Sequence, residues 1–302
     1  MPDPRPSPWP SFPARFAHRV SGLRHLGLFE PDGARFVDCG PVDDLAALAR
    51  GELDTPDLRR RAAGGMAVEP SAIDWDLPVE RPGKLLCLGK NFAAHAKEFG
   101  AEVPEEPIFF TKLPDALLPH EGTVLLPHWL ETRIDHEIEL AVILGFADPQ
   151  RRGRKYVDPA DALTLVSGYT ILNDITARRL QGDDRAQQRP WLRCKSFDTF
   201  CPIGPFVVAR DALPARPDLA IDLWVGDEHR QSSRTGAMVV DVAHAIEYLS
   251  RHTTLHPGDV IAMGTPEGVG PIRDGDEMFG AIEGLGALHN RVAREARPQR
   301  AP

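Results

Sequence analysis

The sequence predicts a β-rich α/β fold, and three observations support this prediction. The chain of 302 residues contains 29 prolines and 26 glycines, which favour many turns and strand ends over a helical bundle. Apolar and β-branched stretches alternate with proline and glycine breaks over most of its length. In the part of the chain beyond residue 100, only residues 158–165 and 240–252 have a strongly helical pattern. The length allows one large domain with a smaller companion.

Composition and charge exclude several classes of protein. Hydrophobic residues make up 42% of the chain and charged residues 26%, as in ordinary globular proteins. The formal net charge of -9 and the pI of about 5.7 disfavour a protein that binds the nucleic-acid backbone. No apolar stretch is long enough to span a bilayer, and the N-terminus lacks the apolar segment of a secretion signal. We therefore expect neither a nucleic-acid partner nor a membrane partner.

The four cysteines predict a reducing environment. They form no C-x-x-C pair and no dense framework, so we expect reduced thiols, a cytoplasmic location and no zinc–thiolate site. The four are Cys39, Cys87, Cys194 and Cys201.

The first 78 residues are predicted to form a tail and a small α/β domain. Residues 1–15 are rich in proline and poor in core-forming side chains, which predicts a flexible tail. In the domain, residues 16–78, the segments L-G-L-F and R-F-V-D predict a hairpin that turns at Asp32 and Gly33. A short helix is expected over residues 42–50. Prolines and a glycine in residues 76–83 predict the boundary to a larger domain, residues 79–297.

The larger domain is expected to begin with a buried strand, residues 84–89, followed by a short helix over residues 91–99. His95 and Glu98 are three residues apart on that helix and so share one face. The carboxylate would orient the imidazole and favour its protonated form, as in a base that takes a proton from water. An exposed helical pair is the alternative. The glycine and prolines of residues 100–107 predict a movable cover.

Residues 133–146 predict a strand with three acidic side chains on one face; their sequence is R-I-D-H-E-I-E-L-A-V-I-L-G-F. Successive strand side chains point to opposite sides, so Asp135, Glu137 and Glu139 share a face on which like charges repel. A hard divalent cation with oxygen ligands is the simplest counter-charge, and a solvated edge strand is the alternative. Asp174, at the end of another expected strand, could supply a third ligand. Locally it could equally cap a helix that starts at Ile175.

A lysine and a glycine-rich loop complete the candidate chemistry. Lys195 lies between bulky neighbours in W-L-R-C-K-S-F-D, as expected of a cation that meets developing negative charge in a pocket. A surface lysine whose stem packs on its neighbours is the alternative. Residues 264–270 follow an expected strand over 259–263, but they lack the G-K-[ST] ending of a phosphate loop. We expect a tight loop there rather than a nucleotide site.

Six segments in one order carry a family resemblance. The chain resembles the fumarylacetoacetate hydrolase family over residues 83–292, and its length is similar to that of the smaller acylpyruvate-processing members. Six collinear segments are far more specific than any one of them. They are G-K-N-F-x-x-H-x-x-E, P-I-F-F-T-K, D-H-E-I-E-L-A-V-I-L-G, G-Y-T-I-L-N-D-I-T-A-R, C-K-S-F-D-T-F-C-P-I-G-P and L-H-P-G-D-V-I-A-M-G-T-P-E-G-V-G.

The resemblance implies a mixed β-roll catalytic domain that forms a homodimer and binds Mg²⁺ or Mn²⁺, with Ca²⁺ as a further possibility. It implies metal ligands and catalytic residues at matching positions, and it does not include Asp135 among the ligands. Two positions depart from the family pattern: Phe92 replaces a tyrosine and Arg179 replaces an aspartate. The implied positions are Glu137, Glu139 and Asp174 for the metal, His95, Glu98 and Lys195 for catalysis, and Lys90, Arg178, Gln181 and Thr265 for the substrate.

The expected function is metal-dependent hydrolysis of a carbon–carbon bond in a small β-diketo acid of the acylpyruvate or fumarylpyruvate type. One alternative keeps the site but decarboxylates an oxaloacetate-like acid or isomerises a hydroxymuconate-type acid. A further alternative is a non-catalytic protein that binds a keto acid. His95, Glu98 and Lys195 argue against it, because binding alone needs no water-activating pair.

Overall fold

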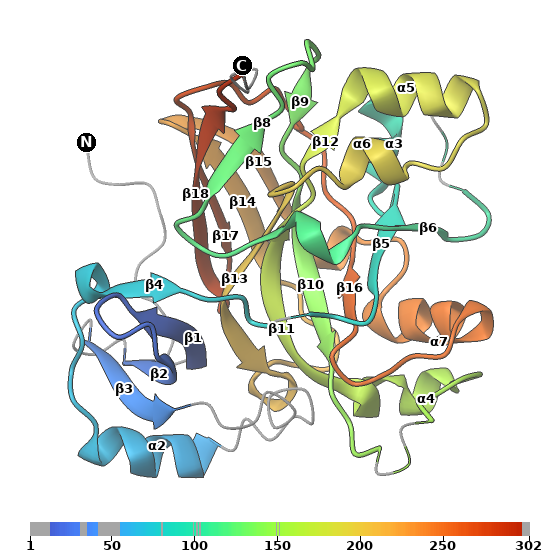
Figure 1. Cartoon of the computed structure of the whole chain (residues 1–302). Coiled ribbons are helices and arrows are strands. Elements are labelled where there is room, and N and C mark those ends of the chain that lie inside the picture. The colour runs from blue at the N-terminus through green and yellow to red at the C-terminus, as the bar shows by residue number, and fades with distance from the viewer. Residues whose placement is uncertain are drawn as a thin grey trace.

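The computed structural model describes residues 13–30, 35–41, 55–79, 81–98, 100, 102, 104–148, 150 and 152–297. Its strands form an eleven-stranded sheet, a five-stranded sheet and a two-stranded sheet. A small unit built from the first strands lies beside a larger body in which the two main sheets face each other (Figure 1). The predicted β-rich α/β fold is confirmed. No helix in the described ranges is long and apolar enough to cross a membrane.

In the described residues, the small unit contains a sheet, a ten-residue α-helix, a single-turn 3₁₀ helix and a further short strand. β2 and β3 pair antiparallel, with Leu28 opposite Val37, which confirms the predicted hairpin. The predicted turn at Asp32 and Gly33, the helix over residues 42–50 and residues 1–12 lie outside the described residues. The elements are β1 (Pro13–His18), β2 (Arg24–Glu30), β3 (Arg35–Pro41), α2 (Thr55–Gly64), η2 (Pro70–Ala72) and β4 (Ile73–Trp75).

The predicted end of the tail at residue 15 is wrong, because β1 begins at Pro13. Ala14 pairs with Gly27 of β2 and with Phe206 of β13 (Cys201–Ala209), so the small sheet is continuous with the main one. Helix α2 is another difference, since its R-R-R-A-A-G sequence has no apolar periodicity from which to predict it.

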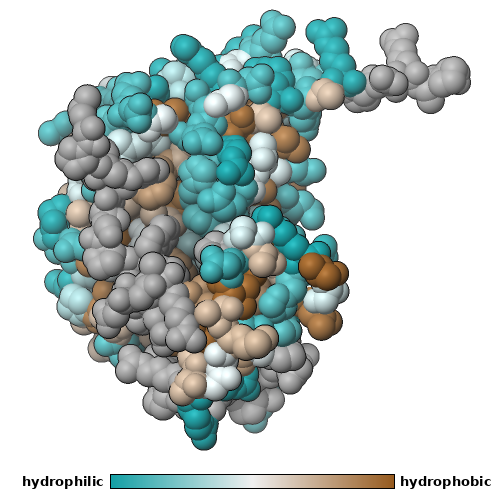
Figure 2. Space-filling model, turned by 90° about the vertical axis from the view of Figure 1, so that its left-hand side faces the viewer, coloured by the Kyte–Doolittle hydropathy of each residue, from teal (hydrophilic) through white to brown (hydrophobic). Residues whose placement is uncertain are grey.

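Figure 2 views the molecule from the side of the small unit. On this face, apolar groups gather mainly in the lower half, and the upper half is mostly hydrophilic.

In the main sheet, β10 lies between β11 (Val166–Asn173) and β16 (Val260–Ala262) and is buried along its whole length. Leu140 and Val142 on β10 belong to a core that also contains Leu223 and Leu288 from the five-stranded sheet. The central elements are β5 (Leu85–Gly89), α3 (Ala93–Glu98), β6 (Ile108–Thr111), η3 (Pro114–Ala116), β7 (Leu117–Leu118), β8 (Thr123–Leu126), β9 (Ile134–Asp135), β10 (Ile138–Leu144), β11 (Val166–Asn173) and β12 (Thr176–Ala177).

The strand predicted over residues 133–146 is interrupted. β9 ends at Asp135 and pairs with β12, and β10 starts only at Ile138. Asp135 therefore lies outside the strand that carries Glu139, and the prediction that three acids share one strand face is wrong. A single residue pattern cannot reveal such a break, because both pieces have the same period-two alternation.

Helices flank the sheets at two levels. α3, α5 and α6 lie at one end of the central strands, and α4 and α7 lie at the other (Figure 1). The predicted helices over 158–165 and 240–252 are confirmed as α4 with η4 and as α7, each capped by an aspartate. The remaining elements are α4 (Pro159–Ala162), η4 (Leu163–Leu165), α5 (Arg178–Ala186), α6 (Leu192–Lys195), β13 (Cys201–Ala209), η5 (Arg210–Ala212), β14 (Ala220–Val225), β15 (Glu228–Arg234), η6 (Thr235–Ala237), α7 (Val242–His252), β16 (Val260–Ala262), β17 (Glu277–Ile282) and β18 (Gly286–Arg294).

Helices α5 and α6 were not predicted, and both bring residues to the site. α5 has the sequence R-R-L-Q-G-D-D-R-A, in which only one large apolar side chain marks a buried face. α6 is a single turn. Asp174 does not cap a helix at Ile175, because α5 starts at Arg178 after Ala177.

Candidate active-site cavity and metal centre

A cavity of about 250 Å³ opens where α3, α5 and α6 meet the ends of β5 and β10. A larger cavity, of about 540 Å³, lies between β4 and the strands β13 and β18, but its lining contains no group of converging carboxylates. The smaller cavity brings together all of the predicted site residues except Glu98 and Asp174. Those lining it are Lys90, His95, Glu137, Glu139, Arg178, Gln181, Lys195 and Thr265.

Three carboxylates converge at the base of this cavity. Glu137 precedes β10, Glu139 lies on it, and Asp174 follows the neighbouring strand β11. Their oxygens lie within 4.8 Å of one another, and the three residues are 4%, 1% and 0% exposed. The backbone N–H of Glu137 donates to the Asn173 side chain at 2.8 Å, which fixes the two strand ends together. The cluster therefore combines two acids at the start of β10 with one at the end of β11.

Two buried lysines oppose this cluster. The Lys195 ammonium lies 2.8 Å from Glu137 Oε2 and 2.5 Å from Asp174 Oδ2, and it stacks 4.9 Å from the Phe110 ring centroid. An ammonium has three N–H donors, so one remains after these two contacts. Lys112, only 1% exposed, lies 2.6 Å from Asp174 Oδ1. The alternative of Lys195 as a surface lysine is excluded by its burial.

Glu137 and Glu139 have opposite electrostatic surroundings. Burial alone would raise the pKa of Glu137, but Lys195, Arg178 and His95 hold it well below its usual range. Burial raises the pKa of Glu139 well above its usual range, and the charges of Asp174 and Glu137 raise it further. Among the described residues Glu139 forms no ion pair. Its carboxylate accepts a hydrogen bond from the Gly264 N–H at 2.8 Å. A divalent cation would supply the charge that Glu139 lacks, and three carboxylates are the oxygen ligands that such a cation prefers, so the residues fit a hard metal ion.

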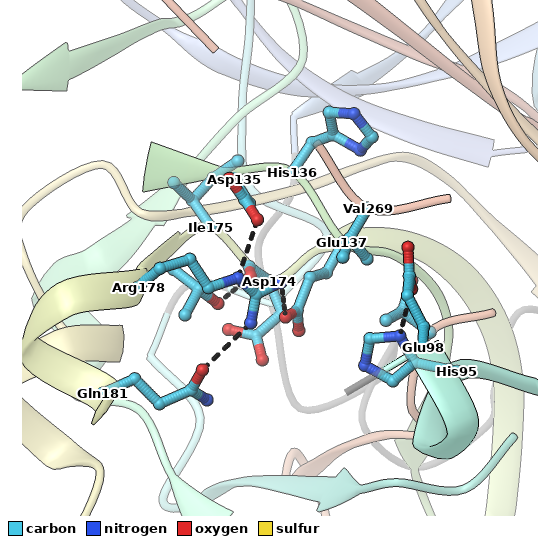
Figure 3. Close-up of polar contacts among 12 residues, drawn as sticks. His95, Glu98, Asp135, His136, Glu137, Asp174, Ile175, Arg178, Gln181 and Val269 are labelled. Atoms are coloured by element: carbon cyan, nitrogen blue, oxygen red, sulfur yellow. Dashed lines mark hydrogen bonds and ion pairs between the residues drawn. The ribbon is translucent and has the colours of Figure 1, made fainter. Parts of the chain in front are cut away.

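Asp135 lies behind the cluster and organises the arginines. Its carboxylate accepts from Arg133 Nε and from Arg178 Nε, both at 2.7 Å. Arg178 also lies 2.6 Å from Glu137 Oε1 and donates to Gln181 Oε1 at 3.0 Å. In Figure 3 Asp135, Arg178 and Gln181 form a connected group on one side of Glu137. Asp135 is thus not one of the converging carboxylates, in agreement with what the resemblance implied.

His95 and Glu98 lie on the other side of Glu137 (Figure 3). His95 Nδ1 donates to Glu98 Oε2 at 3.2 Å, and the second Glu98 oxygen accepts from the Gly268 N–H at 3.4 Å. Glu98 raises the pKa of His95, as predicted, but burial outweighs this effect. Burial lowers the pKa of His95 more than Glu137 and Glu98 raise it, so the ring is neutral near pH 7. A neutral imidazole is the form that can accept a proton.

Comparison with known proteins now identifies the family. Residues 84–293 match the model of the fumarylacetoacetate (FAA) hydrolase C-terminal domain. The chain belongs to the fumarylacetoacetate hydrolase family. Its relatives include the mitochondrial oxaloacetate tautomerase FAHD2A of Bos taurus, which is 37% identical over 305 residues, or 94% of each chain.

Two solved structures extend the comparison. The 5-carboxymethyl-2-hydroxymuconate delta-isomerase of Mycobacterium smegmatis is 33% identical, with a TM-score of 0.74 over 95% of this chain and 100% of the other. The fumarylpyruvate hydrolase of Pseudomonas aeruginosa, solved with Mn²⁺ and pyruvate, is 38% identical, with a TM-score of 0.64 over 74% of this chain and 92% of the other. Family members similar to this chain thus include both hydrolases and isomerising enzymes.

The predicted substrate-holding residues of this family member differ in whether their hydrogen-bond donors are already used within the protein. The Thr265 hydroxyl donates to Ile138 O at 2.8 Å and accepts from Gln231 at 2.8 Å, so its only donor is already used. In contrast, the Gln181 amide nitrogen has no protein acceptor within the described residues. Lys90 lines the cavity with its backbone in the left-handed region, at a φ of 57°.

The two departures from the family pattern lie away from the cavity lining. Phe92 is buried and forms a β-bridge with Met238. Arg179 is mostly exposed, and its guanidinium lies 3.9 Å from the Asp183 carboxylate on the same helix. Neither residue is among those that line the cavity.

Asn91 is an important residue that sequence reasoning missed. Its side chain donates to Val240 O and Met263 O, at 2.9 Å and 2.8 Å, and accepts from Val240 N at 2.7 Å. It thereby fixes the start of α3 to the loop after β16 and to the segment before α7. A Cβ atom on Gly264, whose φ is 86°, would lie 2.9 Å from Asn91 Cβ, so this close approach requires glycine. An asparagine directly after Gly89-Lys90 was the available signal.

Proposed function

We propose that the chain is a divalent-metal-dependent hydrolase that cleaves a carbon–carbon bond in a small β-diketo acid of the acylpyruvate or fumarylpyruvate type. One observation carries the proposal. A single cavity contains a buried carboxylate cluster and, facing it, a neutral imidazole held by a carboxylate. Binding a keto acid needs only the first of these, whereas attack by water also needs the second. The similarity to the fumarylpyruvate hydrolase of Pseudomonas aeruginosa supports the same reaction class.

Glu137, Glu139 and Asp174 would hold Mg²⁺ or Mn²⁺, and an all-oxygen set is also compatible with Ca²⁺. When bound, such an ion supplies the positive charge that polarises a keto acid and stabilises negative charge on its oxygens. The three carboxylates approach from strand ends that are fixed to each other through Asn173 and Glu137. This rigid support suits a site that must be formed before the substrate arrives.

The chain's own residues would perform the proton transfers. His95, oriented by Glu98, would take a proton from the attacking water and later return it to the leaving carbon. The remaining N–H of Lys195 would stabilise the negative oxygen that develops when water adds to the distal carbonyl. Gln181 and Lys90 would bind the substrate carboxylate, and Arg178 would hold Gln181 in place while keeping Glu137 ionised.

A second candidate is a reaction that passes through an enolate without an attacking water, as in a tautomerase, a decarboxylase or an isomerase. It is favoured by similarity along 94% of each chain to the Bos taurus enzyme named an oxaloacetate tautomerase. The Mycobacterium smegmatis isomerase is similar over 95% of this chain. His95 could also move a proton to and from the carbon beside a carbonyl while Lys195 stabilises the enolate oxygen, which requires no attacking water.

Assembly and location are part of the proposal. We infer a homodimer, because the sheet-rich domain of this family is expected to bury a surface against a second copy. Light scattering over a concentration series should give twice the chain mass, and a monomer at micromolar concentration would contradict this. A cytoplasmic location is supported by four buried, free cysteines.

A parallel assay separates the candidate reactions. The metal-free enzyme, before and after Mn²⁺ is added, should be given an acylpyruvate, oxaloacetate and a hydroxymuconate-type diacid. Release of pyruvate from the acylpyruvate supports hydrolysis. A faster keto–enol exchange or loss of CO₂ from oxaloacetate, without acylpyruvate cleavage, supports the second candidate. Tight binding without any turnover would support a non-catalytic protein.

A further inference from the structure

A second group of possible metal ligands lies on the small N-terminal sheet, outside the cavity described above. It consists of His18 at the end of β1, His25 on β2 and Asp38 on β3, whose ligand atoms lie within 4.8 Å of one another. His18 Nε2 lies 2.9 Å from Asp38 Oδ2, and His25 Nδ1 lies 2.8 Å from both Asp38 oxygens. Two imidazoles thus direct a nitrogen at the same carboxylate.

The strand register brings these three residues to one face. Phe16 and His18 are two residues apart on β1, and Phe16 pairs with His25 on β2. The register between β2 and β3 shifts between His25 and Gly27, and such an irregularity turns a side chain toward a new neighbour. The Phe16 ring packs edge-on against both imidazoles, with centroids 5.1 Å and 5.8 Å away. The cluster therefore has a packed apolar floor.

Burial and polarity suit a small cation rather than an exposed ion pair. The side chains of His18, His25 and Asp38 are 28%, 14% and 13% exposed, so the site is half-buried but reachable. The Gly40 N–H also donates to Asp38 Oδ1, at 2.8 Å, and so helps to orient the carboxylate. That bond and the two histidines lower the pKa of Asp38 despite its burial, which keeps it ionised.

The ligand types distinguish this cluster from the carboxylate site. Imidazole nitrogens suit Zn²⁺, Co²⁺ and Ni²⁺, whereas three carboxylates suit Mg²⁺ and Mn²⁺. Zinc bonds of about 2.0–2.2 Å to nitrogen and oxygen place tetrahedral ligands about 3.3 Å apart. The observed separations of 2.8–2.9 Å would need to open by only a few tenths of an ångström.

The second nitrogen of His25 limits how tightly the site can bind a metal. His25 Nε2 is buried without a hydrogen-bond partner among the described residues, and this atom carries a hydrogen in a ring that binds a metal through Nδ1. Leaving that donor unpaired costs free energy, so moderate affinity is expected.

We propose that His18, His25 and Asp38 form a second metal site for a divalent transition ion, with Zn²⁺ as the simplest occupant, that joins the three strands of the N-terminal sheet. Three protein ligands leave a position for water. The site is separate from the proposed catalytic metal and independent of the reaction catalysed.

The test is the number of Zn²⁺ ions bound by the full chain in excess Mg²⁺, measured by calorimetry and elemental analysis. His18→Gln should bind one fewer ion than the unmodified chain. His229→Gln is the matched control, because His229 also lies 2.8 Å from an aspartate, Asp222, but has no second imidazole there. It should bind as many ions as the unmodified chain. Glu139→Gln should retain the Mg²⁺-resistant ion assigned to the N-terminal site.

A measurement on the unmodified chain guards against a folding defect in the variant. Zinc should shift the ¹⁵N resonances of the His18 and His25 rings and raise the melting temperature of the unmodified chain and of His229→Gln. Equal zinc binding by His18→Gln and the unmodified chain would overturn the proposal. So would imidazole signals of His18 and His25 that do not move at saturating Zn²⁺.

Discussion

Glu137, Glu139 and Asp174 lie at the ends of the two central strands, whereas His95 and Glu98 lie on a six-residue helix at the edge of the same cavity. The carboxylates are almost wholly buried and two of them are fixed by buried lysines. Glu98 is 33% exposed, and its two contacts are long, at 3.2 Å and 3.4 Å. The group proposed to bind is held rigidly and the group proposed to activate water is held loosely, so changes in each should have separable effects.

The largest expected effect comes from Lys195→Met. Losing a charged donor from the site should lower turnover by about 10²- to 10³-fold, which corresponds to ~3 to 4 kcal/mol. Binding of oxalate, a planar dianion that resembles the enolate of pyruvate, should change little because metal chelation supplies most of its affinity. Steady-state kinetics beside calorimetric titration with oxalate tests this. Affinity that collapses in parallel with turnover would contradict the role given to Lys195.

Lys112→Met is the matched control for that variant. Lys112 also neutralises Asp174 in the interior but does not line the cavity. Each variant leaves a buried carboxylate with less counter-charge, so each should lose stability, by about 3–5 kcal/mol. The loss of turnover per folded molecule should be clearly larger for Lys195→Met.

His95→Ala should lower hydrolytic turnover by about 10²-fold while the metal remains bound, because it removes the base but none of the carboxylates. Glu98→Gln keeps the imidazole and only weakens its orientation, so its loss should be smaller. His252→Ala, on the distant helix α7, should leave turnover unchanged. Hydrolysis at the unmodified rate in His95→Ala would show that the pair is an ordinary surface feature.

Asn91→Ala tests whether the positions of His95 and Glu98 on α3 depend on the hydrogen bonds of the Asn91 side chain. The substitution leaves buried backbone groups of Val240 and Met263 without partners and should cost about 2–3 kcal/mol in the free energy of unfolding. Asn290→Ala breaks comparable buried bonds far from α3 and is the control. Denaturant unfolding should show losses in both, but turnover of folded enzyme should fall only for Asn91→Ala.

The smallest effect concerns pH. Burial lowers the pKa of His120 to about 4, so between the usual pKa of 6.5 and about 4 the unfolded chain binds a proton that the folded chain does not. Stability is therefore lost as the pH falls through this window. Between about pH 7 and about pH 5.5 the contribution should be about 1 kcal/mol. Unfolding of His120→Gln at both pH values should show a pH dependence smaller by that amount.

The sequence predicted the residues that carry the chemistry of the site better than the residues that position them. Glu137 and Glu139 could be placed because a period-two run of acids in an apolar strand has few explanations. The break before Ile138 could not, since it depends on β12 pairing with Asp135. Lys112 and Asn91 are locally unremarkable residues, and their roles arise from contacts with residues 62 and more positions away. The net lowering of the pKa of His95 by burial could not be predicted, because local spacing carries no information on desolvation.

Titration of the metal-free chain with Mn²⁺, beside the same titration of Glu139→Gln, tests the central claim most directly. The account predicts that the unmodified chain binds Mn²⁺ and turns over only when it is bound. Glu139→Gln should lose both properties, yet its metal-free form should be more stable than the unmodified chain because one buried, unpaired carboxylate has been removed. Full activity after exhaustive chelation, or unchanged Mn²⁺ affinity in Glu139→Gln, would contradict it.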